Sequence, residues 1–222
     1  MMPLGNEYAI EFNPPDLSRV DVPYAQLRCR MSEFTPFVPR STTRDYSTPP
    51  FGLTVRPDPV FWFQISQNMT EMYFEISEYD TEGRGKDSEL IYETSLDLSG
   101  KDGIIRVPVP LDIALETGMT YQWYIHVWVG RESIDSHQKS GWIERVEVSP
   151  ELSNQLARAQ TSLDRARVYA EAGIWHDAFD ILTQERYWVD TPELKAEWEE
   201  LLQSVFGESI PLPKFYEVSK CL

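Results

Sequence analysis

The sequence is short of cysteine, histidine and basic residues, and each shortage excludes a class of protein. Its 222 residues include two cysteines and three histidines, too few for a disulfide scaffold or a zinc cluster. Lysine and arginine number 20 against 36 acidic residues, giving a formal charge of −16. This acidity argues against binding to nucleic acid or to an anionic membrane. No apolar run approaches the roughly 18 residues of a membrane span, so we expect a soluble protein.

Motifs of catalysis and cofactor binding are also missing. The sequence has no Gly-x-Ser-x-Gly elbow, no P-loop and no dinucleotide-binding fingerprint. His126, His137 and His176 fall in no metal-binding pattern. We therefore predict a protein that is not an enzyme and needs neither a cofactor nor a metal. His176, next to Asp177 at the start of an expected helix, is interpreted as a surface or capping residue.

The two cysteines and the first residues bear on the compartment. Cys29 and Cys221 lie near opposite ends of the chain, and a disulfide between them would require an oxidising compartment, so we favour free thiols. The first residues lack the basic and apolar regions of a signal peptide. As written, the sequence predicts a cytoplasmic protein, or an extracytoplasmic one if a signal has been removed.

Proline is concentrated in residues 1–50, which hold 8 of the 16 prolines and carry a net charge of only −1. Proline removes a backbone donor and favours extended backbone. We predict an extended arm, in which aromatic residues such as Phe34 and Phe37 pack against the protein's own domain or a partner. A disordered tail is the alternative.

Residues 51–149 carry short runs of period two, separated by turn signals. Such spacing predicts an antiparallel β-sandwich. The expected strands are 60–65, 72–77, 90–94, 103–109, 121–129 and 142–148.

The segment before the longest expected strand sharpens this prediction. Leu115, Gly118 and Tyr121 follow one another at intervals of three. This arrangement resembles the tyrosine corner, in which a tyrosine hydroxyl bonds to upstream backbone. We therefore expect a fibronectin- or immunoglobulin-like sandwich.

Within the longest strand, alternate side chains point to opposite faces. Tyr121, Trp123, Ile125 and Val127 are predicted to lie in the core. The outward set is interpreted as a platform for a sugar ring or an apolar partner. The alternative is that Phe34 and Phe37, or the helix carrying Trp175, cover this face. The outward residues are Gln122, Tyr124, His126 and Trp128.

From Pro150 the apolar period becomes helical. One stripe from Leu152 to Tyr169 predicts a single long helix ending at Gly173. A second helix is expected around 175–182, and a third begins with Thr191 as N-cap and Pro192 at the first position. Residues 150–207 thus form a helical module, and residues 208–222 a tail.

The first two helices resemble a tetratricopeptide hairpin, with Tyr169 and Trp175 on either side of the turn at Gly173. A single hairpin lacks the stacked neighbours that bury its surface in arrays. We expect it to pack on the sandwich or to be completed by another protein, so Tyr169 and Trp175 are candidate binding residues.

Five motifs follow one another in residues 50–206: FGLT with PVFWF, YQWY, GWIERV, YAEAGIWHDA and WEELLQSV. Their order resembles a family catalogued as domain of unknown function 928. The resemblance implies a cyanobacterial source and no established activity.

Both expected modules are common binding architectures, although a fold alone does not fix a function. The leading hypothesis is a non-catalytic interaction or assembly protein that binds a partner protein through the helical module, the aromatic sheet face or the arm. The alternative is a carbohydrate-binding module that uses Tyr124 and Trp128.

Overall fold

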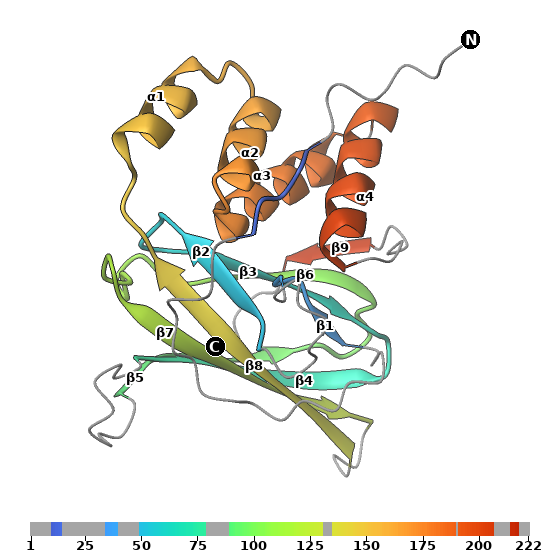
Figure 1. Cartoon of the computed structure of the whole chain (residues 1–222). Coiled ribbons are helices and arrows are strands. Elements are labelled where there is room, and N and C mark those ends of the chain that lie inside the picture. The colour runs from blue at the N-terminus through green and yellow to red at the C-terminus, as the bar shows by residue number, and fades with distance from the viewer. Residues whose placement is uncertain are drawn as a thin grey trace.

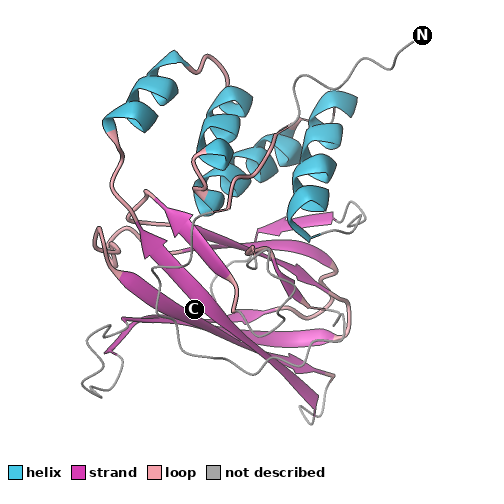
Figure 2. Ribbon diagram, viewed as in Figure 1, coloured by secondary structure: helices cyan, strands magenta, loops and turns pink. Residues whose placement is uncertain are grey.

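The computed structural model describes residues 10–14, 34–39, 49–78, 89–130, 135–189, 191–206 and 214–217. In these ranges a β-rich region of two sheets precedes four helices, and one short strand follows them (Figures 1 and 2). Cys29 and Cys221, and with them the question of a disulfide, lie outside the described residues. No helix in the described part of the chain is long and apolar enough to cross a membrane.

The larger sheet has five strands in the order β2-β8-β7-β4-β5. The pairs β8–β7, β7–β4 and β4–β5 are antiparallel, as expected, whereas β2 pairs with β8 in parallel. Strand β8 begins earlier than the apolar pattern predicts, because its first half is polar, and it ends before Val146. The strands are β2 (Phe51–Thr54), β4 (Met69–Glu78), β5 (Glu89–Asp97), β7 (Thr120–Val129) and β8 (Asp135–Arg145).

The smaller sheet has the order β1-β3-β6-β9. Strands β3 (Val60–Ile65) and β6 (Gly103–Pro108) form its centre. Strand β1 (Thr35–Pro36) comes from the predicted arm, and β9 (Lys214–Glu217) comes from the predicted tail and pairs with β6 in parallel. The expectation of purely antiparallel sheets is therefore wrong at one edge of each sheet, and both terminal regions contribute a strand.

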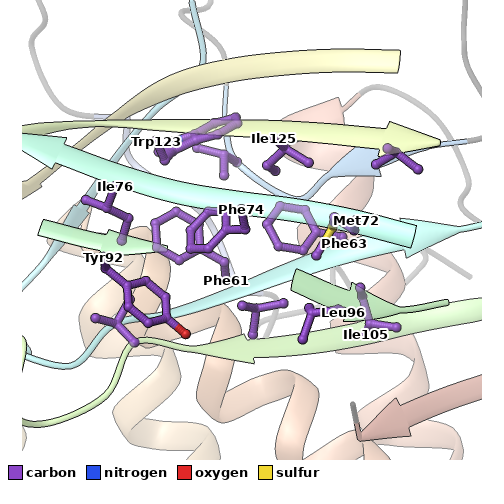
Figure 3. Close-up of a cluster of buried hydrophobic side chains, with 14 of the residues drawn as sticks. Phe61, Phe63, Met72, Phe74, Ile76, Tyr92, Leu96, Ile105, Trp123 and Ile125 are labelled. Carbon is purple, nitrogen blue, oxygen red and sulfur yellow. The ribbon is translucent and has the colours of Figure 1, made fainter. Parts of the chain in front are cut away.

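The main core lies between the two sheets (Figure 3). All four residues predicted to face inward from β7 are buried in it. Phe61 and Phe63 of β3 reach them from the other sheet, and Phe61 lies 5.0 Å from Phe74 of β4 between ring centroids. The alternation of β7 is thus confirmed as the pattern of a strand with one face in the core.

Strand β3 is buried on both faces. Phe61 and Phe63 point into the sheet core, while Val60 and Trp62 belong to a second apolar cluster together with the helices. This double burial explains why residues 60–63 are continuously apolar instead of alternating. The helices therefore cover the face of the smaller sheet that points away from the larger one (Figure 1).

The expected tyrosine contact is present. The Tyr121 hydroxyl accepts a hydrogen bond of 2.8 Å from the backbone N–H of Glu116. Leu115 is buried, and Gly118 adopts a φ of 79° that favours glycine. This bond fixes the chain where it enters β7.

The predicted long helix over 152–169 is wrong, because two helices occupy this region. Helix α1 (Pro150–Arg158) ends at Ala159, which is extended, and α2 (Ser162–Glu171) begins after Thr161. Thr161 and Asp164 form a reciprocal capping box, with 3.0 Å between each backbone nitrogen and the facing side-chain oxygen. A Thr-x-x-Asp pattern signals a helix start, although the apolar stripe runs across the break.

The other helices agree better with the sequence. Helix α3 (Trp175–Trp188) follows α2 after Gly173, which has a φ of 74°. Helix α4 (Pro192–Phe206) is capped as predicted, since Thr191 Oγ1 accepts the N–H of Leu194 at 3.3 Å. Helices α2, α3 and α4 share the second apolar core with β3.

Candidate functional site

Residues 10–14 lie across the helices, between α2 and α4 and over α3 (Figure 1). We call the surface of α2, α3 and α4 that contacts them the arm groove. Ile10 is 1% exposed, whereas Glu11 and Asn13 point outward and are exposed. The segment is thus bound like an extended peptide, with alternate residues facing the groove.

Backbone hydrogen bonds hold both ends of the segment. The N–H of Ile10 donates to Glu197 Oε2 of α4 at 3.0 Å. The N–H of Asn13 donates to the carbonyl oxygen of Ala170, near the end of α2, at 3.1 Å. Because both donors are main-chain groups, a peptide of a different sequence can make the same two bonds.

An aromatic cluster forms the floor of the arm groove. The ring of Phe12 meets Trp175 edge to face at 5.0 Å, and Trp175 stacks on Phe179 at 5.1 Å. The Trp175 indole N–H donates to the carbonyl oxygen of Phe37 at 2.7 Å. The fold therefore holds Trp175 in place, and its indole offers an aromatic contact to a peptide in the groove.

Charged residues line the end of the groove that receives Ile10. Arg167 Nη2 contacts Glu197 Oε1 at 2.6 Å, and Arg167 Nη1 lies 3.6 Å from Asp164 Oδ1. Glu197 is 7% exposed. The guanidinium fixes one oxygen of this carboxylate and leaves the other directed at the peptide.

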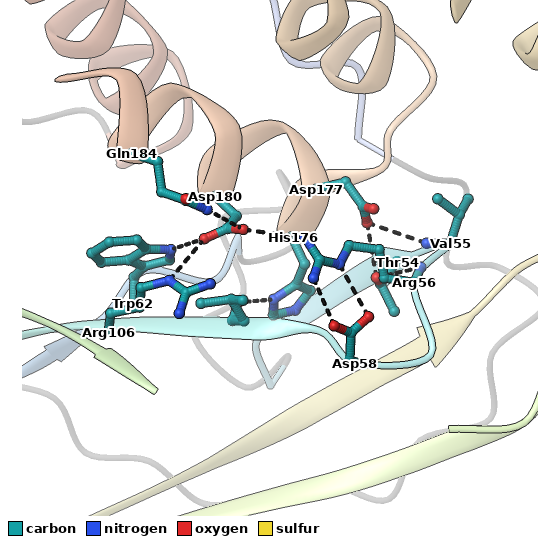
Figure 4. A network of polar contacts seen from close by, with 11 residues as sticks. Thr54, Val55, Arg56, Asp58, Trp62, Arg106, His176, Asp177, Asp180 and Gln184 are labelled. Atoms are coloured by element: carbon teal, nitrogen blue, oxygen red, sulfur yellow. Dashed lines mark hydrogen bonds and ion pairs between the residues drawn. The ribbon is translucent and has the colours of Figure 1, made fainter. Parts of the chain in front are cut away.

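A second polar cluster joins the helices to the sheets (Figure 4). Asp177 Oδ2 accepts hydrogen bonds from the Thr54 hydroxyl at 2.8 Å and from the N–H of Val55 at 3.2 Å. Burial raises the pKa of Asp177 to about 6, although these two bonds oppose the shift. The carboxylate ties the first turn of α3 to the end of β2.

One turn further along α3, Asp180 is buried beside the smaller sheet (Figure 4). It accepts hydrogen bonds from Trp62 Nε1 at 3.0 Å and from Gln184 Nε2 at 2.7 Å. The guanidinium groups of Arg56 and Arg106 lie 3.6 Å and 3.5 Å from its oxygens. Asp180 thus connects α3 with both β3 and β6.

The interpretation of His176 as a surface or capping residue is wrong. His176 is buried against Phe61, with ring centroids 4.8 Å apart, and its Nδ1 lies 3.3 Å from the Val60 carbonyl oxygen. Burial lowers its pKa to about 4. Glycine at position 52 makes room for this ring, because a Cβ there would lie 2.6 Å from His176 Nε2. Since His176 and Asp177 are enclosed, neither offers an atom to a substrate in solution.

The opposed pKa shifts of His176 and Asp177 lead to a pH-dependent prediction. The raised pKa of Asp177 contributes stability that is present below pH 3.8 and lost as the pH rises to about 6. The lowered pKa of His176 contributes stability that is present above pH 6.5 and lost as the pH falls to about 4. Between pH 4 and 6, the stability that Asp177 loses as the pH rises nearly equals the stability that His176 gains. In Asp177→Asn only the contribution of His176 remains, so the free energy of unfolding of the variant should fall as the pH is lowered from 6 to 4.

The measurement is urea unfolding of the wild type and the variant at several pH values. The free energy of unfolding of Asp177→Asn minus that of the wild type should rise by about 2–3 kcal/mol between pH 4 and pH 6. Asp112→Asn, at an exposed position, is the control for removing one carboxylate. If the difference in the free energy of unfolding between Asp177→Asn and the wild type did not change with pH, the raised pKa of Asp177 would be contradicted.

The predicted outward residues of β7 lie on the outer face of the larger sheet, and all four are half-buried. His126 stacks on Trp128 at 4.1 Å and 15°, so one face of the indole is covered by the imidazole. Phe34, Phe37 and Trp175, which were expected as alternative covers, lie in the two cores instead.

The same outer face carries carboxylates. The Tyr73 hydroxyl lies 2.7 Å from Glu93 Oε2 and 2.9 Å from Glu75 Oε2, and these carboxylates and burial raise its pKa. Glu75 pairs with Tyr124 across β4 and β7. The set Gln122, Tyr124, His126 and Trp128 therefore stays a predicted site with acidic neighbours.

Of the two candidates in the helical module, Trp175 contacts the segment in the arm groove, through the ring of Phe12. Tyr169 is buried in the helical core, and burial raises its pKa. Sequence reasoning missed Glu197 and Arg167, which no motif marks. Arg167 and Glu197 lie next to the apolar stripes of α2 and α4, and this position predicts only that they border the core.

The comparisons with known proteins identify the family. No curated protein matches the chain. Among protein-family models, the one described as Domain of Unknown Function (DUF928) matches residues 18–211. This match covers most of the chain and includes both sheets and all four described helices, apart from β9. The chain therefore belongs to the DUF928 family.

Proposed function

We propose that this protein is a non-catalytic interaction protein whose arm groove binds an extended peptide of a partner protein. The observation that carries the proposal is that residues 10–14 already fill this groove. Two main-chain hydrogen bonds and the alternating side chains of Ile10 and Phe12 hold them there.

The segment can be displaced at low cost. Burying the side chains of Ile10 and Phe12 contributes up to about 1.5–3 kcal/mol each, and each of the two hydrogen bonds adds about 0.5–1.5 kcal/mol. Ordering each of the five residues costs about 1–2 kcal/mol. Because these contributions are of similar size, a partner with the same pattern of contacts can compete with the protein's own segment.

The test uses the full-length chain with Ile10→Ser and Phe12→Ser, which remove the two inward side chains. An N-acetylated peptide of sequence Ile-Glu-Phe-Asn-Pro, labelled at its C-terminus, should bind this variant with a dissociation constant below about 1 mM. It should bind the wild type more weakly, because the protein's own segment occupies the groove.

The matched control replaces the exposed Leu90 and Leu111 by serine and should behave as the wild type. Fluorescence anisotropy reports the binding, and circular dichroism checks that each variant is folded. Absence of saturable binding to the folded Ile10→Ser/Phe12→Ser chain, whether the peptide is acetylated or has a free amine, would refute the proposed function.

The second candidate is carbohydrate binding on the outer face of the larger sheet. The observation that favours it is the presence of the half-buried Tyr124 and Trp128 beside Glu75 and Glu93, since sugar sites combine aromatic rings with polar groups. On this alternative, Tyr124→Ala/Trp128→Ala should abolish a glycan-array signal. A glycan-array signal that is unchanged in the double variant excludes it.

The finer descriptions of the fold belong to the same proposal. The Tyr121 bond to Glu116 supports a fibronectin- or immunoglobulin-like sandwich. The buried Ala166 and Ala178, with Gly173 between α2 and α3, support a tetratricopeptide-like hairpin. A cyanobacterial source remains what the family resemblance implies.

A further inference from the structure

The carboxylate of Glu197 is aimed at the backbone nitrogen of the first inward residue of the bound segment. Its Oε2 accepts the N–H of Ile10 at 3.0 Å, while Arg167 holds its Oε1. A carboxylate has about four lone-pair sites, and a peptide amide supplies only one hydrogen to them. An α-ammonium group at the same place would supply three hydrogens and a positive charge.

The charges around this nitrogen also favour a cation. Asp164 and Glu197 bring two negative charges, and Arg167 brings one positive charge. The guanidinium is thus shared between two carboxylates, and the three side chains together carry one net negative charge, of which only Glu197 contacts the Ile10 nitrogen. Because Glu197 is largely buried, solvent screens this charge less than it would at the surface.

The remaining contacts set a sequence pattern. The Ile10 side chain is enclosed, so the first position of the pattern takes an apolar residue. Glu11 is exposed, so the second position accepts any residue type. Phe12 contacts Trp175, so the third position takes an aromatic residue. The N–H of Asn13 bonds to Ala170, so the fourth position needs only a backbone donor.

We infer that the arm groove selects the free N-terminus of a partner polypeptide, with an apolar first residue and an aromatic third residue. The α-ammonium group of this partner pairs with Glu197. This inference rests on the proposed function, since it names the partner class of the same groove. The protein's own residues 10–14 then occupy the groove as a weaker, amide-linked substitute.

The experiment compares two peptides that differ only at the amine. Ile-Glu-Phe-Asn-Pro with a free N-terminus and its N-acetylated form are titrated into full-length Ile10→Ser/Phe12→Ser at pH 6.5, where an α-amine is protonated. The free peptide should bind about tenfold more tightly, because charge-assisted hydrogen bonds are roughly twice as strong as neutral ones. Adding Glu197→Gln should remove this preference, while the exposed control Glu193→Gln should retain it.

The outcomes separate the two proposals. Equal affinity for both peptides, or tighter binding of the acetylated one, overturns the selection of an amine and leaves peptide binding in place. Binding of neither peptide overturns both. If the variant does not fold, hydrogen exchange of the Ile10 and Asn13 amides in the wild-type chain gives the same answer. Excess free peptide should then accelerate their exchange more than acetylated peptide does, and equal acceleration overturns the inference.

Discussion

Replacing Gly141 by alanine is expected to lower the free energy of unfolding by about 3 kcal/mol or more, the upper range for overpacking a core. Gly141 of β8 lies directly opposite Trp123 of β7, and the indole occupies the space where a side chain would stand. A Cβ at position 141 would also lie 2.6 Å from the Pro50 carbonyl oxygen. That oxygen accepts the N–H of Trp142 at 2.8 Å, so it cannot move without loosening the sheet.

The matched control is Gly100→Ala. Gly100 has a φ of 75°, and a Cβ there meets no atom within 4 Å. Its substitution should cost only the backbone strain of about 1–2 kcal/mol. Urea unfolding followed by tryptophan fluorescence compares the two variants, and near-ultraviolet circular dichroism reports changes in the packing of the aromatic core. If Gly141→Ala were as stable as Gly100→Ala or more stable, the claim that Trp123 leaves no room for a side chain at position 141 would be wrong.

Much of the β-rich region could be predicted, because apolar and polar residues alternate along its strands or the strands are apolar throughout. The faces of β7 follow directly from this period, and Tyr121 marks its start. Strand β1 has two residues and includes Pro36, so it carries no period. The first half of β8 is polar, and β9 lies in a segment whose pairing depends on β6. Such strands are specified by tertiary contacts and not by local pattern.

The arm groove could be predicted only in part. Trp175 was identified because helix-hairpin spacing is a local pattern. The contact between Ile10 and Glu197 joins residues 187 positions apart in the chain, and no spacing rule encodes such a contact. Likewise, the sequence pattern predicts that Asp177 and Asp180 are ordinary polar residues at the start of α3. Their burial depends on Thr54 and Trp62 of the sheets, which the sequence places in another module.

Asp180→Ala is expected to destabilise the protein by about 3 kcal/mol, near the lower end for removing one partner of a buried ion pair. The substitution removes the hydrogen bond from Trp62 Nε1 and the carboxylate that faces Arg56 and Arg106, while Arg56 keeps its ion pair with Asp58. Both guanidinium groups are partly exposed, with 39% and 26% of their side-chain surface accessible, and water therefore compensates part of the loss.

The substitution should weaken the packing of the helices on the smaller sheet most, because Asp180 joins α3 to β3 and β6. Hydrogen exchange of the α3 amides should then accelerate more than that of β7, whose bonds lie within the larger sheet. Asp180→Asn keeps an acceptor for Trp62 and should lie between the wild type and Asp180→Ala in stability. The exposed control Asp112→Ala should change the free energy of unfolding by less than about 0.5 kcal/mol. Equal stability of Asp180→Ala and this control would show that the carboxylate does not hold the helices to the smaller sheet.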